Sequence, residues 1–340
     1  MHPRLSSLHF FLSCSLLLLS LQSCAAPHKP GVSHDAVARS STLVVTPGLF
    51  LYEVTGPRGT SHLLGTIHVG FGFEEVLTDD ARVRFHAAER VMTEADVSKS
   101  DPELLVRAAL LAPQDSLRRL LGEPTWTKLV ERLSAQLPEP VLDRLEPWLP
   151  AVMLGLRELE DVLRELKPGS ENRLMDVELV RLAGMEQKPV THFETVAEQI
   201  AIFDTIPLSD QARELAHALE QPSAIQARQL FTAFAAGDAQ ALESALFDEA
   251  QIEGSRGFYD RVLYQRNARW LPLIERELAR GGTFIAVGAA HLLGERGILA
   301  TLAQRGYSVK RVGADTKPPP RELQTPAAST APRTRSATSS

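Results

Sequence analysis

Apolar residues recur in two different patterns between residues 48 and 313. Six short runs, apolar or alternating with polar residues, are typical of β-strands: residues 50–54, 61–64, 90–94, 188–192, 283–287 and 308–312. The first two runs are separated by Thr55–Thr60, so we predict a hairpin with its turn at Gly56–Gly59. The run at 283–287 is apolar after Thr283, as expected of a buried strand.

Leu-rich stretches with a helical period fill most of the remaining sequence. They predict helices at residues 79–89, 172–183, 195–204, 209–219, 223–247, 257–280 and 292–305. The pattern from Asp101 to Leu166 is helical too, but it is interrupted by Pro113, Pro124, Pro138, Pro140, Pro147 and Pro150. Strands that alternate with helices predict the α/β class: a mixed β-sheet flanked by helices, with a helical cap or insertion at about 100–170.

Both ends of the chain differ in composition from this region. Residues 24–47 contain Pro, Ser and His without an apolar period, which predicts a disordered tether. Residues 314–340 are richer still in Pro, Ser, Thr and Ala, which predicts a disordered tail. One folded domain, residues 48–313, is therefore expected between them.

The first residues have the features of a secretory leader. Arg4 precedes an apolar run, residues 10–21, which is shorter than the roughly 20 residues that a spanning helix needs. Leu-Gln-Ser before Cys24 resembles a bacterial lipobox, which implies a signal peptide of residues 1–23 and a lipid on Cys24. The expected location is then the cell envelope, at the outer membrane and facing the periplasm. Conventional cleavage shortly after Cys24, leaving a soluble periplasmic protein, is the alternative.

Composition narrows the possible functions. The chain has 340 residues, two cysteines and a formal net charge of −6. Its length and its 44% hydrophobic content are enough for one large core without disulfides. The mild acidic charge offers no basic surface for phosphates, so we expect no nucleic-acid partner. Because Cys14 would leave with the leader and Cys24 would carry the lipid, neither thiol remains for a zinc ribbon or a disulfide.

Two Gly-x-x-His segments are the strongest candidates for chemistry. Gly65–His68 and Gly288–His291 each follow an apolar run directly, whereas Gly31–His34 lies in the tether and Gly59–His62 lies within the hairpin. The carboxyl ends of strands are where α/β sheets bind ligands. A glycine at that point lets the backbone turn sharply beside a bound ion or substrate. His68 and His291 are therefore the candidate ligands.

Glu94 supplies a carboxylate at a third strand end. It closes the predicted strand at 90–94, and Asp96 would share its face if the strand continued. Two imidazoles and a carboxylate form a mixed nitrogen and oxygen set, which suits Zn, Mn, Co or Fe. The sequence contains neither His-Glu-x-x-His nor Gly-x-Ser-x-Gly, which excludes a zincin and argues against a nucleophile-elbow serine hydrolase.

Six sequence blocks, in order along the folded region, resemble the TraB/GumN family, which includes the Tiki metalloproteases. Their order along the chain is more specific than any single block. The blocks are residues 52–68, which end in Leu-Gly-Thr-Ile-His, then Glu94, residues 174–176, residues 193–199, Arg266–Asn267 and residues 287–295.

The resemblance implies a metal-dependent site formed by His68, His291 and Glu94, with a divalent ion such as Mn, Co or Zn. The ion would activate a water molecule, and Glu94 would be either a third ligand or the general base. The family's Arg-Asn pair matches Arg266 and Asn267, which would donate to a developing oxyanion. Family members in animals cleave peptide bonds of a secreted signal.

Glu194 and Asp176 match two further blocks of the family. Glu194 is a candidate catalytic residue, although Phe193 stands before it where an aliphatic residue is usual. Asp176 is expected to anchor a helix or loop.

The expected function is therefore a metal-dependent hydrolase, a peptidase or amidohydrolase that acts on a peptide or protein outside the cytoplasm. A lipoprotein that binds haem, iron or a peptide without turnover is the main alternative. A degenerate member that serves only as an interaction module is a third, against which the complete set of matching residues argues. The expected partners are the substrate and, through the lipid, the membrane, while the oligomeric state is not predicted.

Overall fold

The computed structural model describes residues 50–313, apart from 97–98, 100, 169–173, 221–223 and 248–255. The predicted leader with Cys24, the tether and the tail lie outside the described residues. None of the helices described in this part of the chain is both long and apolar enough to cross a membrane.

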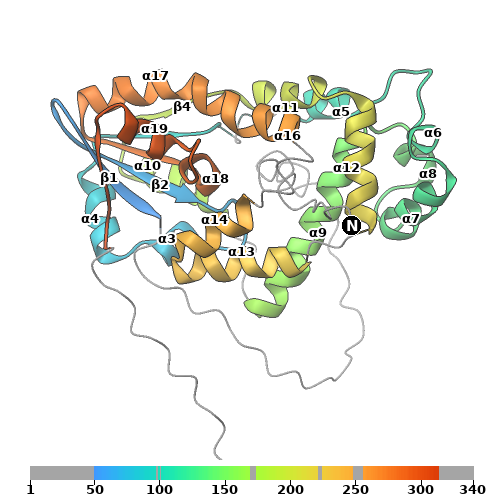
Figure 1. Ribbon diagram of the computed structural model, residues 1–340, viewed down its shortest axis with the longest axis horizontal. Helices are drawn as coiled ribbons and strands as arrows, with labels where there is room; N and C mark the ends of the chain where they lie inside the picture. The colour runs from blue at the N-terminus through green and yellow to red at the C-terminus, as the bar shows by residue number, and fades with distance from the viewer. Residues whose placement is uncertain are drawn as a thin grey trace, which may run out of the picture.

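All six predicted strands are present and form one mixed sheet in the order β4-β3-β5-β2-β1-β6 (Figure 1). Strands β4, β3, β5 and β2 are parallel neighbours, whereas β1 runs antiparallel to both β2 and β6. The predicted α/β class and mixed sheet are therefore confirmed. The strands are β1 Leu51–Gly56, β2 Gly59–Thr66, β3 Arg90–Thr93, β4 Val190–His192, β5 Thr283–Gly288 and β6 Ser308–Arg311.

The first two strands form the predicted hairpin. Their register runs from Leu51 opposite Leu64 to Gly56 opposite Gly59, with the turn between the two glycines. Gly59 has a φ of +141°, which an L side chain rarely adopts, so a glycine suits this corner. The hairpin fixes where β2 ends, and hence where the Gly65–His68 turn begins.

Helices cover both faces of the sheet. Phe284 of β5 packs against Phe73 and Phe85, which lie on α3 and α4. The preceding residue, Thr283, donates a hydrogen bond to Glu277 of α17, so this long helix covers the opposite face. Every residue of β5 is buried, as expected of a central strand covered on both sides.

A separate group of helices lies beside one end of the sheet. Figure 1 shows α5 to α9 and α12 on the right, away from most of the sheet. Trp148 of α9 stacks on Phe203 of α11 with ring centroids 4.4 Å apart, so helices from both sides of residue 170 share this block. The helices are α3 Phe73–Val76, α4 Asp79–Ala87, α5 Pro102–Ala108, α6 Leu117–Leu121, α7 Glu123–Leu133, α8 Glu139–Leu142, α9 Trp148–Leu166, α10 Met175–Met185, α11 Val196–Asp204, α12 Leu208–Glu220, α13 Ala224–Ala236, α14 Ala239–Leu246, α16 Arg256–Tyr259, α17 Gln265–Arg280, α18 Ala289–Leu292 and α19 Ile298–Gln304, with a π-helical turn η2 at Asp260–Tyr264.

Two predicted helices differ in the structure, one by division and one by its start. The segment at 223–247 forms α13 and α14 because Gly237 has a φ of +64° and Asp238 caps the second helix through its side chain. The helix predicted at 292–305 begins only at Ile298 as α19, because Gly294, with a φ of +80°, lies between it and the short helix α18 at Ala289–Leu292, which was not predicted. Pro150 does not interrupt a helix, because it lies in the first turn of α9.

Candidate functional site

Four parallel strands bring the predicted residues to one edge of the sheet. In the register of β2 and β5, Thr66 lies opposite Gly288, so the two Gly-x-x-His turns emerge side by side. Glu94 follows β3, the other neighbour of β5, and its carbonyl accepts a hydrogen bond of 3.0 Å from the N–H of Glu194, which follows β4. The site is thus built at the carboxyl edge, where α/β sheets bind ligands.

His68 is held by Asp176 from the start of α10. Its Nδ1 lies 2.8 Å from Oδ2 of Asp176, and Thr66 donates to Oδ1 of the same carboxylate at 3.1 Å. All three residues are buried. This contact fixes the imidazole ring and leaves its Nε2 facing Gly288, where an added Cβ would lie only 3.2 Å from that atom.

Arg266 lies at the centre of the cluster although it would be a surface charge by default. Its guanidinium donates to Oε2 of Glu94 at 2.6 Å and to Oε1 of Glu194 at 2.9 and 2.6 Å. It also donates to the carbonyl of Val262, in the π-helical turn just before it, at 3.0 Å. Single-turn π-helices occur often at functional sites. Two carboxylates therefore share one fully buried cation.

His291 is fixed on both nitrogens. Nδ1 lies 2.7 Å from Oδ1 of Asn267, and Nε2 lies 3.1 Å from Nη1 of Arg266. The Asn267 oxygen can only accept a hydrogen bond, so we assign the proton of the ring to Nδ1. The Arg266 guanidinium can only donate, so Nε2 carries the lone pair. The Asn267 amide also donates to the carbonyl of His291 at 3.2 Å, so both of its polar groups serve to position this histidine.

The electrostatics of the cluster follow from these contacts. Burial by itself favours a neutral Glu94, but His291, Arg266 and His68 around it and the N–H of Gly288 lower the pKa of the carboxyl to about 2. Burial lowers the pKa of His291 to about 3, and Arg266 beside it acts in the same direction. At neutral pH, Glu94 is therefore ionised and His291 is neutral.

The charge state of His68 is set by its carboxylate partner. Burial acts to lower the pKa of its imidazole, but the charge and hydrogen bond of Asp176, together with Glu94, outweigh burial and raise the pKa above its usual value of 6.5. A divalent ion at His68 would therefore compete with a proton that this imidazole holds more tightly than an ordinary histidine does.

Stability of the metal-free protein should fall as the pH falls below about 6.5. Between that pH and about 3, the unfolded chain protonates His291 while the folded chain does not, so unfolding is favoured by acid at about 1 kcal/mol per pH unit. His68 adds nothing here, because a raised pKa keeps it protonated in both states. Urea unfolding in the presence of a chelator, at about pH 6, 5.5 and 5, where His68 is protonated in both states, measures the slope, and equal stability at all three would contradict it.

The predicted metal ligands converge only in part. Among the described residues, no three His, Cys, Asp or Glu side chains form a group that could hold a metal ion. The reason is that the Arg266 guanidinium already contacts Nε2 of His291 and one oxygen of Glu94. Nε2 of His68 and Oε1 of Glu94 both border Gly288, within 3.2 and 3.3 Å of where its Cβ would be, and Oε1 accepts a hydrogen bond of 2.7 Å from the Gly288 N–H.

The way the two histidines are held also suits a metal site. Each ring is fixed through Nδ1 by an oxygen atom, of Asp176 for His68 and of Asn267 for His291, which is the usual support for metal-bound imidazoles. The structure thus brings Nε2 of His68 and Oε1 of Glu94 to Gly288, while Nε2 of His291 contacts Arg266.

Two residues beside the cluster were not singled out as site residues by the sequence. Trp270 of α17 packs against the ring of His291 at 4.4 Å between centroids, contacts the Arg266 guanidinium at 4.6 Å, and donates to Oε2 of Glu194 at 3.3 Å. Asp176 was expected to be an anchor, and the structure shows that it anchors His68 in particular. The block of residues 174–176 was the available signal for it, whereas nothing in the sequence pointed to Trp270.

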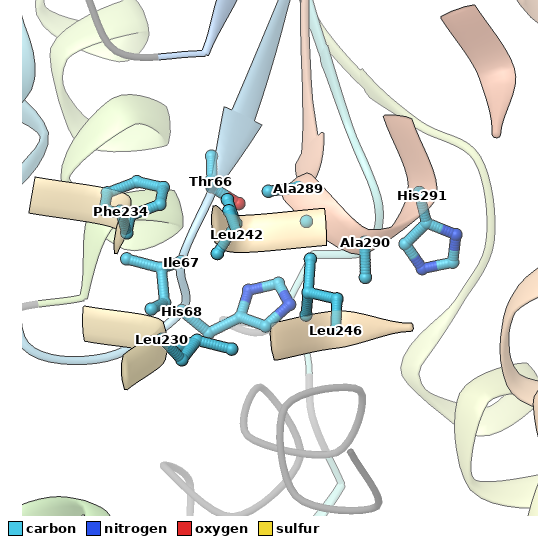
Figure 2. Close-up of a pocket in the computed structure, with 11 residues that line it drawn as sticks. Thr66, Ile67, His68, Leu230, Phe234, Leu242, Leu246, Ala289, Ala290 and His291 are labelled. Carbon is cyan, nitrogen blue, oxygen red and sulfur yellow. The ribbon is translucent and has the colours of Figure 1, made fainter. Parts of the chain in front are cut away.

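A small cavity adjoins the cluster. It comprises about 390 Å³ free of protein atoms, part of it open to solvent, and both His68 and His291 line it with Gly288 (Figure 2). Its other walls are almost entirely apolar.

The fold and the cluster together define an α/β protein with a buried charged site at the carboxyl edge of four parallel strands. Residues 50–311 match the TraB/PrgY/gumN family, and the chain belongs to this family. It is 27% identical over 240 residues, 69% of this chain and 84% of the relative, to the uncharacterized protein YbaP of Shigella flexneri. It is 26% identical over 239 residues, with the same coverage, to YbaP of Escherichia coli strain K12. No solved structure matches the chain.

Proposed function

We propose that this protein is a metal-dependent hydrolase of peptide or amide bonds that acts outside the cytoplasm. The observation that carries the proposal is the convergence of His68, Glu94, His291 and Arg266 in one buried cluster beside a cavity. Buried imidazole and carboxylate groups with altered pKa values, lying in a concave site, are typical of catalytic centres. The predicted leader and the lipid on Cys24 are the basis for the proposed location.

Two side chains are suited to bind the ion. His68 and Glu94 would hold it through Nε2 and Oε1, with His291 as a third ligand when Arg266 moves from its Nε2. When bound, an ion such as Mn, Co or Zn supplies Lewis acidity that lowers the pKa of a water molecule and polarises a carbonyl. Glu94 is ionised at neutral pH, so it is suited to bind the ion as a carboxylate, but a pKa of about 2 makes it a weak proton acceptor. It would act as general base only after release from Arg266, whose charge helps to lower that pKa.

The other charged residues orient these groups. Arg266 holds Glu94 in place and is the cation nearest to where a negative oxygen would develop, so it would stabilise that charge. Glu194 accepts from Arg266 and Trp270, and it therefore positions the guanidinium. Asn267 positions His291 rather than donating to substrate, because both of its polar groups are already used.

The test is a hydrolysis assay that includes metal removal. The purified full-length protein is treated with a chelator, and Mn²⁺, Co²⁺ or Zn²⁺ is added back singly to a mixed peptide library read by mass spectrometry. We expect no cleavage in chelator and restoration by at least one ion. Cleavage unaffected by chelation, or none with any ion, would overturn the metal-dependent mechanism. A Soret band in the purified protein would instead support haem binding without turnover.

A further inference from the structure

The guanidinium of Arg266 contacts two of the three proposed metal ligands at the point where they face each other. Nε2 of His291 lies 3.8 Å from Oε1 of Glu94. Nη1 of Arg266 lies 3.1 Å from that Nε2, and Nη2 donates to Oε2 of the same carboxylate at 2.6 Å. All three side chains are 3% exposed or less. The positive charge next to these two groups therefore comes from the chain itself.

Arg266 and a divalent ion cannot both bind Nε2 of His291. A neutral imidazole has one nitrogen that donates and one that accepts, and Nδ1 of this ring already contacts the oxygen of Asn267. The single lone pair on Nε2 accordingly accepts either the guanidinium N–H or an ion. At Glu94 the two cations exclude each other by charge, because like charges repel strongly where water is excluded.

The same two groups are spaced for one ion. Nitrogen and oxygen ligands lie about 2.0–2.2 Å from Zn²⁺, so two ligands of one ion are at most about 4.4 Å apart. The 3.8 Å between Nε2 of His291 and Oε1 of Glu94 is within this limit. Oε1 also accepts a hydrogen bond from the N–H of Gly288, and a carboxylate oxygen has a second lone pair for an ion. The guanidinium and an ion therefore have the same two binding partners.

Arg266 keeps other partners if it gives up these two. Glu194 accepts from its Nε at 2.9 Å and from its Nη2 at 2.6 Å. The ring of Trp270 lies 4.6 Å from the guanidinium carbon, and its N–H donates to the other oxygen of Glu194. Neither of these residues is a proposed metal ligand. The guanidinium can therefore leave Glu94 and His291 without becoming an unpaired buried cation, which would be costly.

We propose that Arg266 is an internal competitor of the divalent ion and thereby regulates how tightly the site binds metal. The proposal rests on the metal-dependent function proposed above. In the metal-free protein, Arg266 pairs with Glu94 and His291 and neutralises the buried carboxylate. With an ion bound, Arg266 pairs with Glu194 alone. The site thus has an arginine-paired state and an ion-bound state, and only the second has the Lewis acid that hydrolysis needs.

Removing the guanidinium should tighten metal binding. Arg266→Met combined with Glu194→Gln is the informative variant, because it removes one positive and one negative charge and keeps all three proposed ligands. We expect its dissociation constant for at least one of Mn²⁺, Co²⁺ and Zn²⁺ to be about tenfold or more lower than that of the wild type, within the usual range of coupling between two binding events. The net charge of the cluster is unchanged, and damage to the fold would weaken binding instead.

Two further variants complete the test. Glu194→Gln alone should raise the dissociation constant about fivefold or more, because the displaced guanidinium would lose its carboxylate. Arg269→Met is the matched control, since Arg269 lies 3.7 Å from the same carboxylate but its side chain is 60% exposed. It should change the constant by less than about threefold. Titration calorimetry with each metal chloride, on full-length protein stripped with a chelator, measures all of these constants.

Peptide cleavage by the same proteins separates the two proposals. If the double variant binds an ion at least about tenfold more tightly and no protein cleaves peptides, the competition stands and the hydrolase function fails. If the wild type cleaves peptides with metal but the double variant binds the ion no more tightly, the competition is refuted and the hydrolase stands. Glu194→Gln with wild-type or tighter affinity refutes the competition even if the double variant does not fold. If no protein binds any of the ions, both proposals are overturned.

Discussion

Replacing Arg266 with Met is expected to lower the free energy of unfolding by about 3–5 kcal/mol, which is the usual cost of removing one partner of a buried ion pair. The Arg266 side chain is 2% exposed, and the carboxylates of Glu94 and Glu194, which it contacts, are 1% and 4% exposed. Without the guanidinium, two negative charges remain close together in a region that excludes water. Met matches the length of the side chain, so the expected loss arises from charge rather than from a large cavity.

Two further variants distinguish this explanation from simple loss of packing. Arg269 lies 3.7 Å from Glu194 but its side chain is 60% exposed, so Arg269→Met should change stability by less than about 1 kcal/mol. Adding Glu94→Gln and Glu194→Gln to Arg266→Met removes both unpaired charges and should recover most of the loss. Urea unfolding measures all of these variants. A loss below about 1 kcal/mol for Arg266→Met, or a triple variant no more stable than the single one, would contradict the charge argument.

The strands could be predicted because each depends on its own residues, but apart from the β1–β2 hairpin their pairing could not. The apolar run at 283–287 indicates a buried strand in any context. That β5 lies between β2 and β3 depends on contacts between segments about 200 residues apart. The prediction of one continuous helix at 223–247 was wrong for a local reason. Its apolar period continues through Gly237, whose left-handed backbone the pattern does not reveal.

The positions of the candidate residues were predictable where these residues follow strand ends, and their surroundings were not predictable where helices contribute. His68, Glu94 and His291 could be found because each follows an apolar run. Arg266 has no such local signal and was identified through the family resemblance alone. The structure supplies its environment, in which it lies between Glu94 and His291, two of the three predicted ligands. Such a contact depends on how α17 packs, which no local pattern encodes.

Replacing His68 with Gln is expected to lower kcat/KM for peptide hydrolysis by about 10²–10⁴-fold, the range for loss of a group that activates the attacking water. Gln cannot supply the imidazole Nε2 that faces Gly288 in the site. His62→Gln is the matched control, since His62 ends a Gly-x-x-His segment of the same strand but lies before its carboxyl end and contacts Glu53 instead. It should keep activity within about threefold of the wild type.

Asp176 should act only through His68, and a double-mutant cycle tests this dependence. Asp176→Asn removes the carboxylate 2.8 Å from Nδ1, so we expect about a 10–100-fold loss in metal affinity or kcat/KM, as for other groups that support a metal ligand. In a His68→Gln background the same change should cost almost nothing, because the ring that it orients is absent. Circular dichroism confirms that each variant is folded. If the losses caused by Asp176→Asn and by His68→Gln multiply in the double variant, Asp176 has a role of its own. If His68→Gln alone retains activity within tenfold of the wild type, His68 is not the residue that activates water.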